Sequence, residues 1–300
     1  MNRRRVSRPG RIFALAALAV CLMGIPGGAS AAAQPVRVLV AEGRTSLTVA
    51  SGGGLTVTDA SGRRMLAQRA GREPLRLLLK GDAVLIRETG TSDSTVIVWP
   101  GRLPTVDLEG PAYRGRLEVR RLDGALAAVN VVDLEEYLQG ALKDEIPPGW
   151  PAEAAKAMAV VARTYAVYQM EQNLGDFFHL RATTASQVYG GATGEDARTS
   201  SAVQATRGQI LTFGGQPIPA FYHSCSGGAT EDALDVFGPN FDTVIGVKDD
   251  FSLSCPYILW VERLTAQQIE RALQRAGFSD RKSTRLNSSH SDRSRMPSSA

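Results

Sequence analysis

The sequence predicts an α+β fold in which antiparallel strands come first and helices follow. One observation is the period-two alternation of apolar and polar residues in short runs between residues 36 and 99, which glycine-rich turns interrupt. Another is that apolar residues after residue 150 recur at spacings of three and four, as on a helix with one buried face. We therefore expect a β-rich accessory region at 32–104 and a helix-containing second domain with an antiparallel sheet at 105–279.

The first segment has the pattern of a secretory signal peptide. Five arginines precede the apolar run from Ile12 to Ile25, and Ala29-Ser30-Ala31 offers small residues for cleavage. We expect residues 1–31 to be removed and the protein to be exported. A membrane anchor is the alternative, but the apolar run is shorter than the roughly 20 residues that span a bilayer. Lipidation at Cys21 is a further alternative, and the bulky Val20 before it argues against it.

The last segment reads as foreign to the protein. The runs DRKSTRLNSSH, from Asp280, and SRMPSSA resemble the translation of a common short-read sequencing adapter, so we expect 280–300 to be non-native. A natural Ser/Arg-rich disordered tail is the alternative. Without the two terminal segments, 24 Lys and Arg face 28 Asp and Glu, so the formal charge of +4 becomes about −4. This balance gives no support to nucleic-acid binding.

Strands are predicted wherever alternation is bounded by turn residues. The expected strands of the accessory region are VRVLV, SLTVAS, GLTVTD, PLRLLL, AVLIRE and STVIVW. No acid/base cluster or nucleophile stands out among them. The next expected unit is a hairpin of Tyr113–Val119 and Ala125–Val132 around Asp123-Gly124.

Helices are predicted from caps and from apolar spacing. Asp133 with Glu136 is expected to cap a short helix through Leu142. A second helix is expected from Pro151 to about Asn173, with an inward face of Ala154, Met158, Val161, Tyr165 and Tyr168. The remaining expected elements are a helix at 197–206, a strand pair at 209–213 and 218–223, and a helix from Thr265 to Ala276 with Ile269, Ala272 and Leu273 inward.

Glu145 occupies a special position between the first two predicted helices. Ile146 precedes Pro147 and is therefore pushed toward an extended conformation, so the helix cannot continue and Glu145 stands at a helix-to-loop corner. Ile146, the prolines and Trp150 are apolar neighbours that would raise the pKa of its carboxyl group. An isolated glutamate in such a turn is more often simply solvated.

Five stretches in fixed order carry a family resemblance between Gly110 and Asp249. They are YRGRLEV, LEEYLQGALKDEIPPGWPAEAAKAMAVVARTYA, ATTASQVYGG, AVQATRGQIL and AFYHSCSGGATE. Together they resemble the stage II sporulation protein D / LytB (amidase enhancer) family. The sequence departs from the family pattern at Ala141–Asp144, and the C-terminal part of the family domain is missing.

The resemblance implies a peptidoglycan lytic transglycosylase whose catalytic glutamate is Glu145, so that 105–279 would be a catalytic domain. One carboxyl group can serve as acid and then as base, because the sugar's own 6-hydroxyl is the nucleophile; ordinary glycoside hydrolysis needs a second carboxylate. The family also includes non-catalytic wall-binding activators of an N-acetylmuramoyl-L-alanine amidase, which is the alternative reading. The implied partners are glycan strands and, in the second reading, an amidase.

Further candidates for substrate binding come from the matched motifs. Arg163 is expected to be buried in the second helix, where either a structural carboxylate or the acetamido and lactyl oxygens of a substrate would pair with it. The loop candidates for substrate binding are Gln187, Tyr189, His223, Ser224 and Ser226. No G-x-S-x-G element accompanies His223, so a serine hydrolase is not indicated.

Cys225 and Cys255 remain after signal removal and are expected to form a disulfide, as suits an exported protein. A zinc site that adds His179 and His223 is the alternative, but the scattered spacing lacks a paired C-x-x-C element. No cofactor is expected.

Overall fold

The computed structural model describes residues 35–238, 241, 243–255 and 261–277. The predicted signal peptide and the predicted adapter-derived segment lie outside these residues. All the described residues fall within one compact unit. Within the described part of the chain, no helix is both long and apolar enough to cross a membrane.

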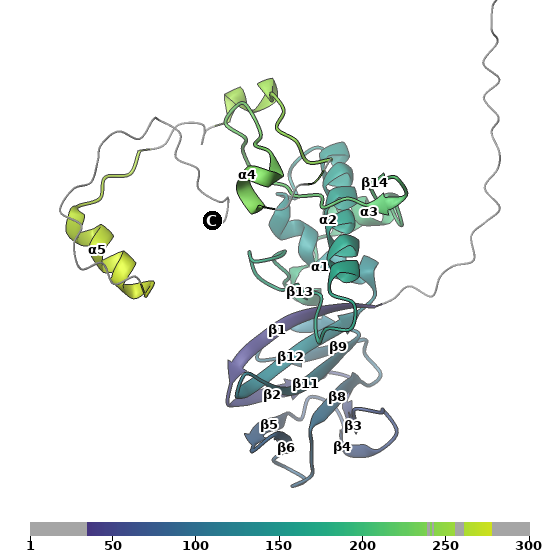
Figure 1. The fold of residues 1–300 in the computed structure, drawn as a ribbon. Coiled ribbons are helices and arrows are strands. Elements are labelled where there is room, and N and C mark those ends of the chain that lie inside the picture. Colours follow the sequence, from purple (N-terminus) through teal and green to yellow (C-terminus); the bar gives the residue numbers. More distant parts are fainter. Residues whose placement is uncertain (1–34, 239–240, 242, 256–260, 278–300) are drawn as a thin grey trace, which may run out of the picture. The chain divides into compact units, whose positions relative to one another are not determined.

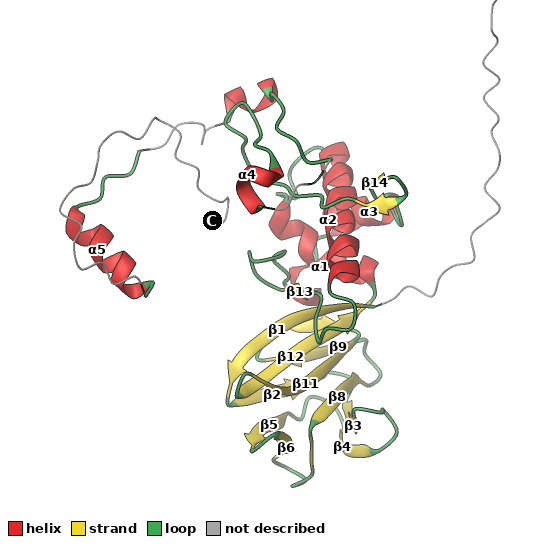
Figure 2. Ribbon diagram, viewed as in Figure 1, coloured by secondary structure: helices red, strands yellow, loops and turns green. Residues whose placement is uncertain are grey.

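The fold is α+β, as predicted, with sheets dominating the N-terminal half (Figures 1 and 2). A seven-stranded sheet has the order β13-β1-β12-β11-β8-β3-β4. Its strands are β13 (Leu180–Arg181), β1 (Val36–Arg44), β12 (Ala125–Val132), β11 (Arg116–Leu122), β8 (Thr95–Pro100), β3 (Leu55–Asp59) and β4 (Met65–Arg69). A six-stranded sheet has the order β10-β9-β2-β5-β6-β7. Its strands are β10 (Ala112–Arg114), β9 (Thr105–Leu108), β2 (Ser46–Ala50), β5 (Leu75–Lys80), β6 (Ala83–Ile86) and β7 (Ser92–Asp93).

All six strands predicted from alternation in the accessory region are present. The predicted hairpin around Asp123-Gly124 is confirmed as β11 and β12, with left-handed φ angles of 50° at Asp123 and 83° at Gly124, as a tight two-residue turn requires. Its first strand begins at Arg116 and not at Tyr113, because the strand is interrupted at Gly115 and Tyr113 belongs to β10 of the other sheet. The prediction missed β4, β7, β9 and β13, because short strands without clear alternation give little signal in the sequence.

The predicted division at residue 104 does not coincide with a boundary between compact units. Strand β8, before it, pairs with β11, after it, and β2 pairs with β9 in the same way. Strand β1 pairs with β12 from Val36 opposite Val132 to Arg44 opposite Leu126. Most buried apolar side chains of both sheets and of the helices belong to one hydrophobic cluster, so the helices pack on the sheets. A smaller second cluster lies on β1 and β12.

The helices that follow β12 are α1 (Leu134–Glu145), α2 (Ala152–Gln172) and α3 (Ala197–Ala205). Asp133 caps α1 by accepting from the N–H groups of Glu135 and Glu136. Helix α1 ends three residues later than predicted.

The buried face of α2 is shifted by one position from the predicted one. Ala154, Met158, Val161 and Tyr168 are only partly buried, and only Tyr165 of the predicted set is fully buried. The fully buried stripe consists of Ala155, Ala159, Ala162 and Ala166, together with Arg163, Thr164 and Tyr165. Alanine allows neighbouring elements to approach closely, and that advantage is not visible in hydrophobicity alone.

The later elements are shorter than predicted. The strand pair is reduced to β14 (Thr212–Phe213) and β15 (Gln216–Pro217). The final helix, α5 (Ala266–Arg275), has the predicted Thr265 cap, in a capping box with Gln268. Its predicted inward face is wrong within the described residues: Ile269 is half-buried, whereas Ala272 and Leu273 are exposed. The remaining helical turns are η1 (Gly191–Gly194), α4 (Ala233–Phe237) and η2 (Asp250–Ser254).

Candidate active site

Glu145 is the last residue of α1 and stands at the corner that the sequence predicts. Ile146 caps the helix in an extended conformation with φ −141° and ψ 128°, as a residue before proline prefers. Ile146 is buried, Glu145 is half-buried and Asp144 is exposed. Trp150, expected to help cover Glu145, is itself 58 % exposed.

Neutral donors hold the Glu145 carboxylate. The backbone N–H of Val188 donates to its Oε1 at 3.0 Å. The hydroxyl of Tyr222 forms a second hydrogen bond with the carboxyl group. Glu145 makes no ion pair with any Lys, Arg or His of the described residues, so its charge is stabilised by dipoles alone.

Tyr222 belongs to a chain of hydrogen bonds whose donors and acceptors can be assigned. The amide nitrogen of Gln187 donates to the carbonyl oxygen of Ala162 and to the hydroxyl oxygen of Tyr222, both at 3.3 Å. Because the Ala162 carbonyl can only accept, it fixes which end of the amide carries the nitrogen. The hydroxyl of Tyr137 must then donate to Oε1 of Gln187, at 2.9 Å. Tyr222, already accepting from Gln187, is left to donate to Glu145.

Burial raises the pKa of the Glu145 carboxyl group, as the sequence predicts. The hydrogen bonds from Val188 and Tyr222 oppose this rise, and the nearby charge of Asp144 adds to it. Burial also raises the pKa of Tyr222, and the negative charge of Glu145 reinforces the effect. Tyr222 therefore stays protonated and remains a donor at neutral pH. A carboxyl group with a raised pKa can begin a reaction as an acid.

Glycines allow the segment that carries Val188 to lie against α1. The N–H of Gly190 donates to the carbonyl of Gly140 at 3.1 Å. A Cβ atom on Gly140 would lie 2.5 Å from the carbonyl oxygen of Gly191, a distance that side chains do not tolerate. Glycine at Gly140 therefore sets the spacing between α1 and the loop that supplies the Val188 donor.

Arg163 serves the interior and not a substrate. Its Nε donates to Oε1 of Glu135 and its Nη2 to Oε2, each at 2.8 Å. Its other contacts are with Ala159 O, Val203 O, Thr206 Oγ1 and Gln209 O. Arg163 is 1 % exposed and each of its guanidinium nitrogens has an acceptor. Its partner is therefore the structural carboxylate of Glu135, and the expected contact with a substrate is wrong.

Gln187 and Tyr189, also expected to bind substrate, are both buried. Gln187 is 0 % exposed and acts on Glu145 through Tyr222. Tyr189 donates to Oδ1 of Asn130 at 2.8 Å and packs against the ring of Tyr137. Because both side chains are buried, they position other residues of the site and do not line a surface that a substrate could contact.

The loop after Tyr222 contains the remaining candidates. His223 and Ser224 are exposed, and the structure places neither of them against Glu145. Ser226 donates to Oδ2 of Asp249 at 2.7 Å and accepts from the N–H of Gly228, so its hydroxyl organises the loop. His223 and Ser224 remain candidates because they directly follow Tyr222 in the chain.

Cys225 and Cys255 form the predicted disulfide. It joins the loop after Tyr222 to the end of η2. Nδ1 of His179, a ligand in the zinc alternative, accepts from the backbone N–H of Arg37. Within the described residues, no three His, Cys, Asp or Glu side chains are grouped so that they could hold a metal ion.

The sequence analysis missed Tyr222, the residue that links Gln187 to Glu145. It lies in the AFYHSCSGGATE stretch, beside the predicted His223 and Ser224. Nothing in that pattern separates Tyr222 from its neighbour Phe221, which packs against Phe237. Only the contact with Glu145, across a large separation in the chain, singles it out.

Comparison with known proteins supports the family resemblance over this part of the chain. A family model described as Stage II sporulation protein matches residues 122–213. This stretch contains α1, Glu145, α2 and Gln187, so the part of the chain that carries the candidate site is similar to that family. Tyr222 and the disulfide lie outside the match.

Individual proteins are also similar to part of this chain. An amidase enhancer of Bacillus subtilis is 36% identical over 133 residues, which is 44% of this chain and 17% of that protein. Stage II sporulation protein D of Bacillus subtilis is 28% identical over 161 residues, covering 49% of this chain and 47% of that protein. An uncharacterized protein of Brachyspira hyodysenteriae is 37% identical over 132 residues, which is 44% of this chain and 36% of that protein. The match spans less than half the length of each of these relatives.

Proposed function

We propose that this protein is a peptidoglycan lytic transglycosylase that cleaves the bond between N-acetylmuramic acid and N-acetylglucosamine. The observation that carries the proposal is the environment of Glu145. Its carboxyl group is half-buried, has a raised pKa, has neutral donors in place of a cation, and lies within the matched family domain. A carboxyl group in this environment can give up a proton and later take one back.

In the proposed reaction, protonated Glu145 donates to the glycosidic oxygen as the bond to C1 of N-acetylmuramic acid breaks. The carboxylate then accepts the proton of the 6-hydroxyl while O6 forms a bond to C1. The products are a 1,6-anhydro-N-acetylmuramic acid end and a new hydroxyl on the leaving sugar. Glu145 ends protonated, as it began, so a second carboxylate is not required.

Tyr222 and Val188 have positioning roles in this scheme. Their hydrogen bonds stabilise the carboxylate that exists between the two proton transfers, and they prevent the pKa from rising too far. Gln187 keeps the Tyr222 hydroxyl directed at Glu145. The enzyme would act outside the cytoplasmic membrane, without an organic cofactor, and would prefer strands already stripped of stem peptides.

The test is digestion of purified glycan strands, followed by mass spectrometry for anhydro-muramic ends. Glu145→Gln should reduce their formation by about 10²- to 10⁴-fold, because it removes the acid and base group. Asp144→Asn is the matched control, since it removes the neighbouring exposed carboxylate, and it should retain most of the activity. Equal activity of wild type and Glu145→Gln would overturn the proposal.

A second candidate function is activation of a cell-wall amidase without catalysis. It is favoured by the similarity to a relative named amidase enhancer. If wild type and Glu145→Gln both leave glycan strands intact while both stimulate an added amidase to the same extent, this second function replaces the first.

A further inference from the structure

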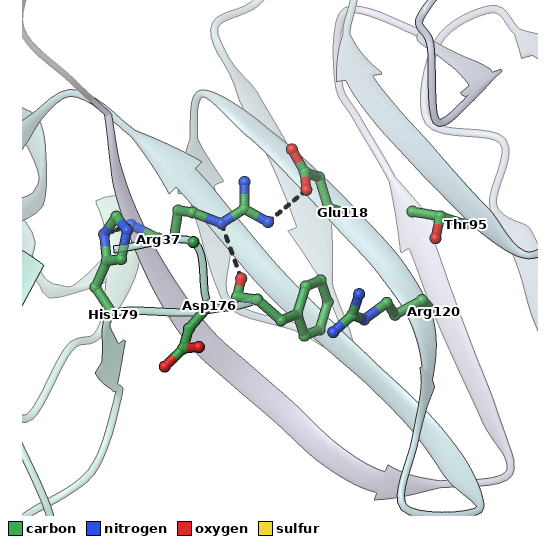
Figure 3. A pocket seen from close by; sticks show the side chains of 8 residues that line it. Arg37, Thr95, Glu118, Arg120, Asp176 and His179 are labelled. Atoms are coloured by element: carbon green, nitrogen blue, oxygen red, sulfur yellow. Dashed lines mark hydrogen bonds and ion pairs between the residues drawn. The ribbon is translucent and has the colours of Figure 1, made fainter. Parts of the chain in front are cut away.

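A pocket lies under the segment between α2 and β13, on the face of the seven-stranded sheet that the main core does not cover. Phe177 and Phe178 of this segment pack on a small apolar cluster of Leu39, Ala127, Val129 and Val131. The pocket has a volume of about 390 Å³, and Figure 3 shows its lining. The lining side chains that matter here are Arg37, Thr95, Glu118, Arg120, Asp176 and His179.

Two of the three guanidinium nitrogens of Arg37 are engaged in the wall of this pocket. Its Nη2 pairs with Oε2 of Glu118 at 2.7 Å, and its Nε donates to the carbonyl of Phe177 at 2.8 Å, as Figure 3 shows. The other oxygen of Glu118 accepts from Nη2 of Arg116 at 3.1 Å. Glu118 therefore pairs with two arginines already, and it forms no ion pair with Arg120.

Arg120 lacks a carboxylate partner among the described residues. Its guanidinium carbon lies 3.7 Å from the centre of the Phe177 ring, and its Nε is buried without a hydrogen-bond acceptor in this part of the chain. Contact with an aromatic face stabilises a cation only in part. A buried guanidinium N–H without an acceptor is unfavourable, so an anion that enters the pocket and accepts from it would remove that penalty.

Two more donors line the pocket. Thr95 is the cross-strand partner of Arg120 in the pairing of β8 with β11, so the two side chains are neighbours on one face. Nδ1 of His179 accepts from the backbone N–H of Arg37 at 3.2 Å, so in the neutral ring the hydrogen is on Nε2. Burial and the charge of Arg37 lower the pKa of His179, which keeps the ring neutral at neutral pH.

The acidic lining residues limit the charge of the ligand. Glu118 and the exposed Asp176 offset the charges of Arg37 and Arg120. A dianion would meet repulsion from both carboxylates, whereas a single negative charge needs only one free cation. We propose that this pocket is a binding site for a monoanionic carboxylate group, held by Arg120 and assisted by Thr95. The site is independent of Glu145.

The test uses acetate as the probe and follows the Nε–Hε signal of Arg120 by nuclear magnetic resonance at constant ionic strength. Acetate should shift this signal saturably, whereas equal concentrations of chloride should not. Arg120→Gln serves to assign the signal. It should also weaken acetate binding at least about 10-fold, as judged from the amide signals of the neighbouring Phe177.

Arg121→Gln is the matched control. Arg121 is next to Arg120 on β11, is exposed, and pairs with Asp82 instead of facing the pocket. This variant should bind acetate as wild type does. If Arg120→Gln does not fold, the acetate titration of the wild-type protein still decides the question.

Three results would overturn the proposal. One is an Arg120 signal that responds equally to acetate and chloride. Another is unchanged acetate binding in Arg120→Gln. A third is tighter binding of inorganic phosphate at pH 8 than of acetate, because it would show that the pocket prefers a dianion. None of these results depends on glycan cleavage, so failure here is distinguishable from failure of the transglycosylase proposal.

Discussion

The two ends of α1 carry glutamates in opposite environments. Glu135, in the first turn, is 8 % exposed, forms a two-point ion pair with Arg163, and also accepts from the N–H of Gly208. Glu145, in the last turn, has the Val188 N–H and the Tyr222 hydroxyl as hydrogen-bond partners and no cationic partner among the described residues. The helix dipole favours a negative charge at the first end and disfavours it at the second.

This contrast teaches how one helix can carry both a structural and a reactive carboxylate. At Glu135 the carboxylate is held by its two-point ion pair with Arg163. The neutral donors at Glu145 compensate for burial only in part, so the pKa of its carboxyl group stays raised. A proton can therefore leave and return at Glu145, whereas Glu135 links α1 to α2 through its ion pair with Arg163.

The largest effect is expected when Arg163, the cation that pairs with Glu135 in the first turn of α1, is removed. Arg163→Gln should destabilise the protein by about 3–5 kcal/mol, because it leaves Glu135 buried with its charge unpaired. Chemical denaturation monitored by circular dichroism would measure the change in the free energy of unfolding. The matched control is Arg198→Gln on α3, whose side chain is 68 % exposed and should contribute less than about 1 kcal/mol. A loss below about 1 kcal/mol in Arg163→Gln would show that the pair is not structural.

A smaller effect is expected when one donor at the second end is removed. Tyr222→Phe deletes a hydrogen bond that lowers the pKa of Glu145, so the pKa should rise further. Activity that needs protonated Glu145 is lost as the pH rises through that pKa, so the alkaline limb of the pH–rate profile should move to higher pH. The rate at the optimum should fall about 10-fold because the carboxylate is less well positioned.

Tyr189→Phe is the control for Tyr222→Phe, since its hydroxyl bonds to Asn130 and not to Glu145. Its alkaline limb should coincide with that of wild type. A limb that moves to lower pH in Tyr222→Phe would contradict the assigned direction of the hydrogen bond.

The smallest expected effect is on stability at the second end. Since the folded-state pKa of Glu145 is raised, the folded protein holds this proton more tightly than the unfolded chain does. Ionisation of Glu145 therefore destabilises the fold. This loss of stability develops as the pH rises from the pKa of the unfolded chain, about 4.3, through the higher pKa of the folded protein. Glu145→Gln removes this penalty and should stabilise the protein at pH 7 by less than about 2 kcal/mol.

Thermal unfolding at several pH values checks this prediction. The stabilisation by Glu145→Gln should disappear below about pH 4, where the wild-type carboxyl group is protonated in both states. A variant that is less stable than wild type at pH 7 would show that the Glu145 charge supports the fold and would remove the distinction between the two glutamates.

Local sequence signals predicted much of this region correctly. The proline after Ile146 predicted the corner at Glu145, Asp133 predicted the start of α1, and two cysteines predicted the disulfide. These features depend on neighbouring residues or on simple counting. The role of Arg163 was left between two alternatives, because its carboxylate, Glu135, lies 28 residues away and only the packing of α1 on α2 joins them.

By itself, the sequence determined the α+β class, the strands with clear alternation, the helix caps and the position of Glu145 at the end of a helix. Each of these follows from steric restrictions and periodicity over a few residues. Tertiary structure alone decided that Tyr222, Gln187 and Tyr137 form one chain of donors behind Glu145. It also decided that Arg120 has no carboxylate partner in the described part of the chain. Such facts depend on which distant segments share one interior, because burial and the loss of water act on residues that are neighbours only in the folded protein.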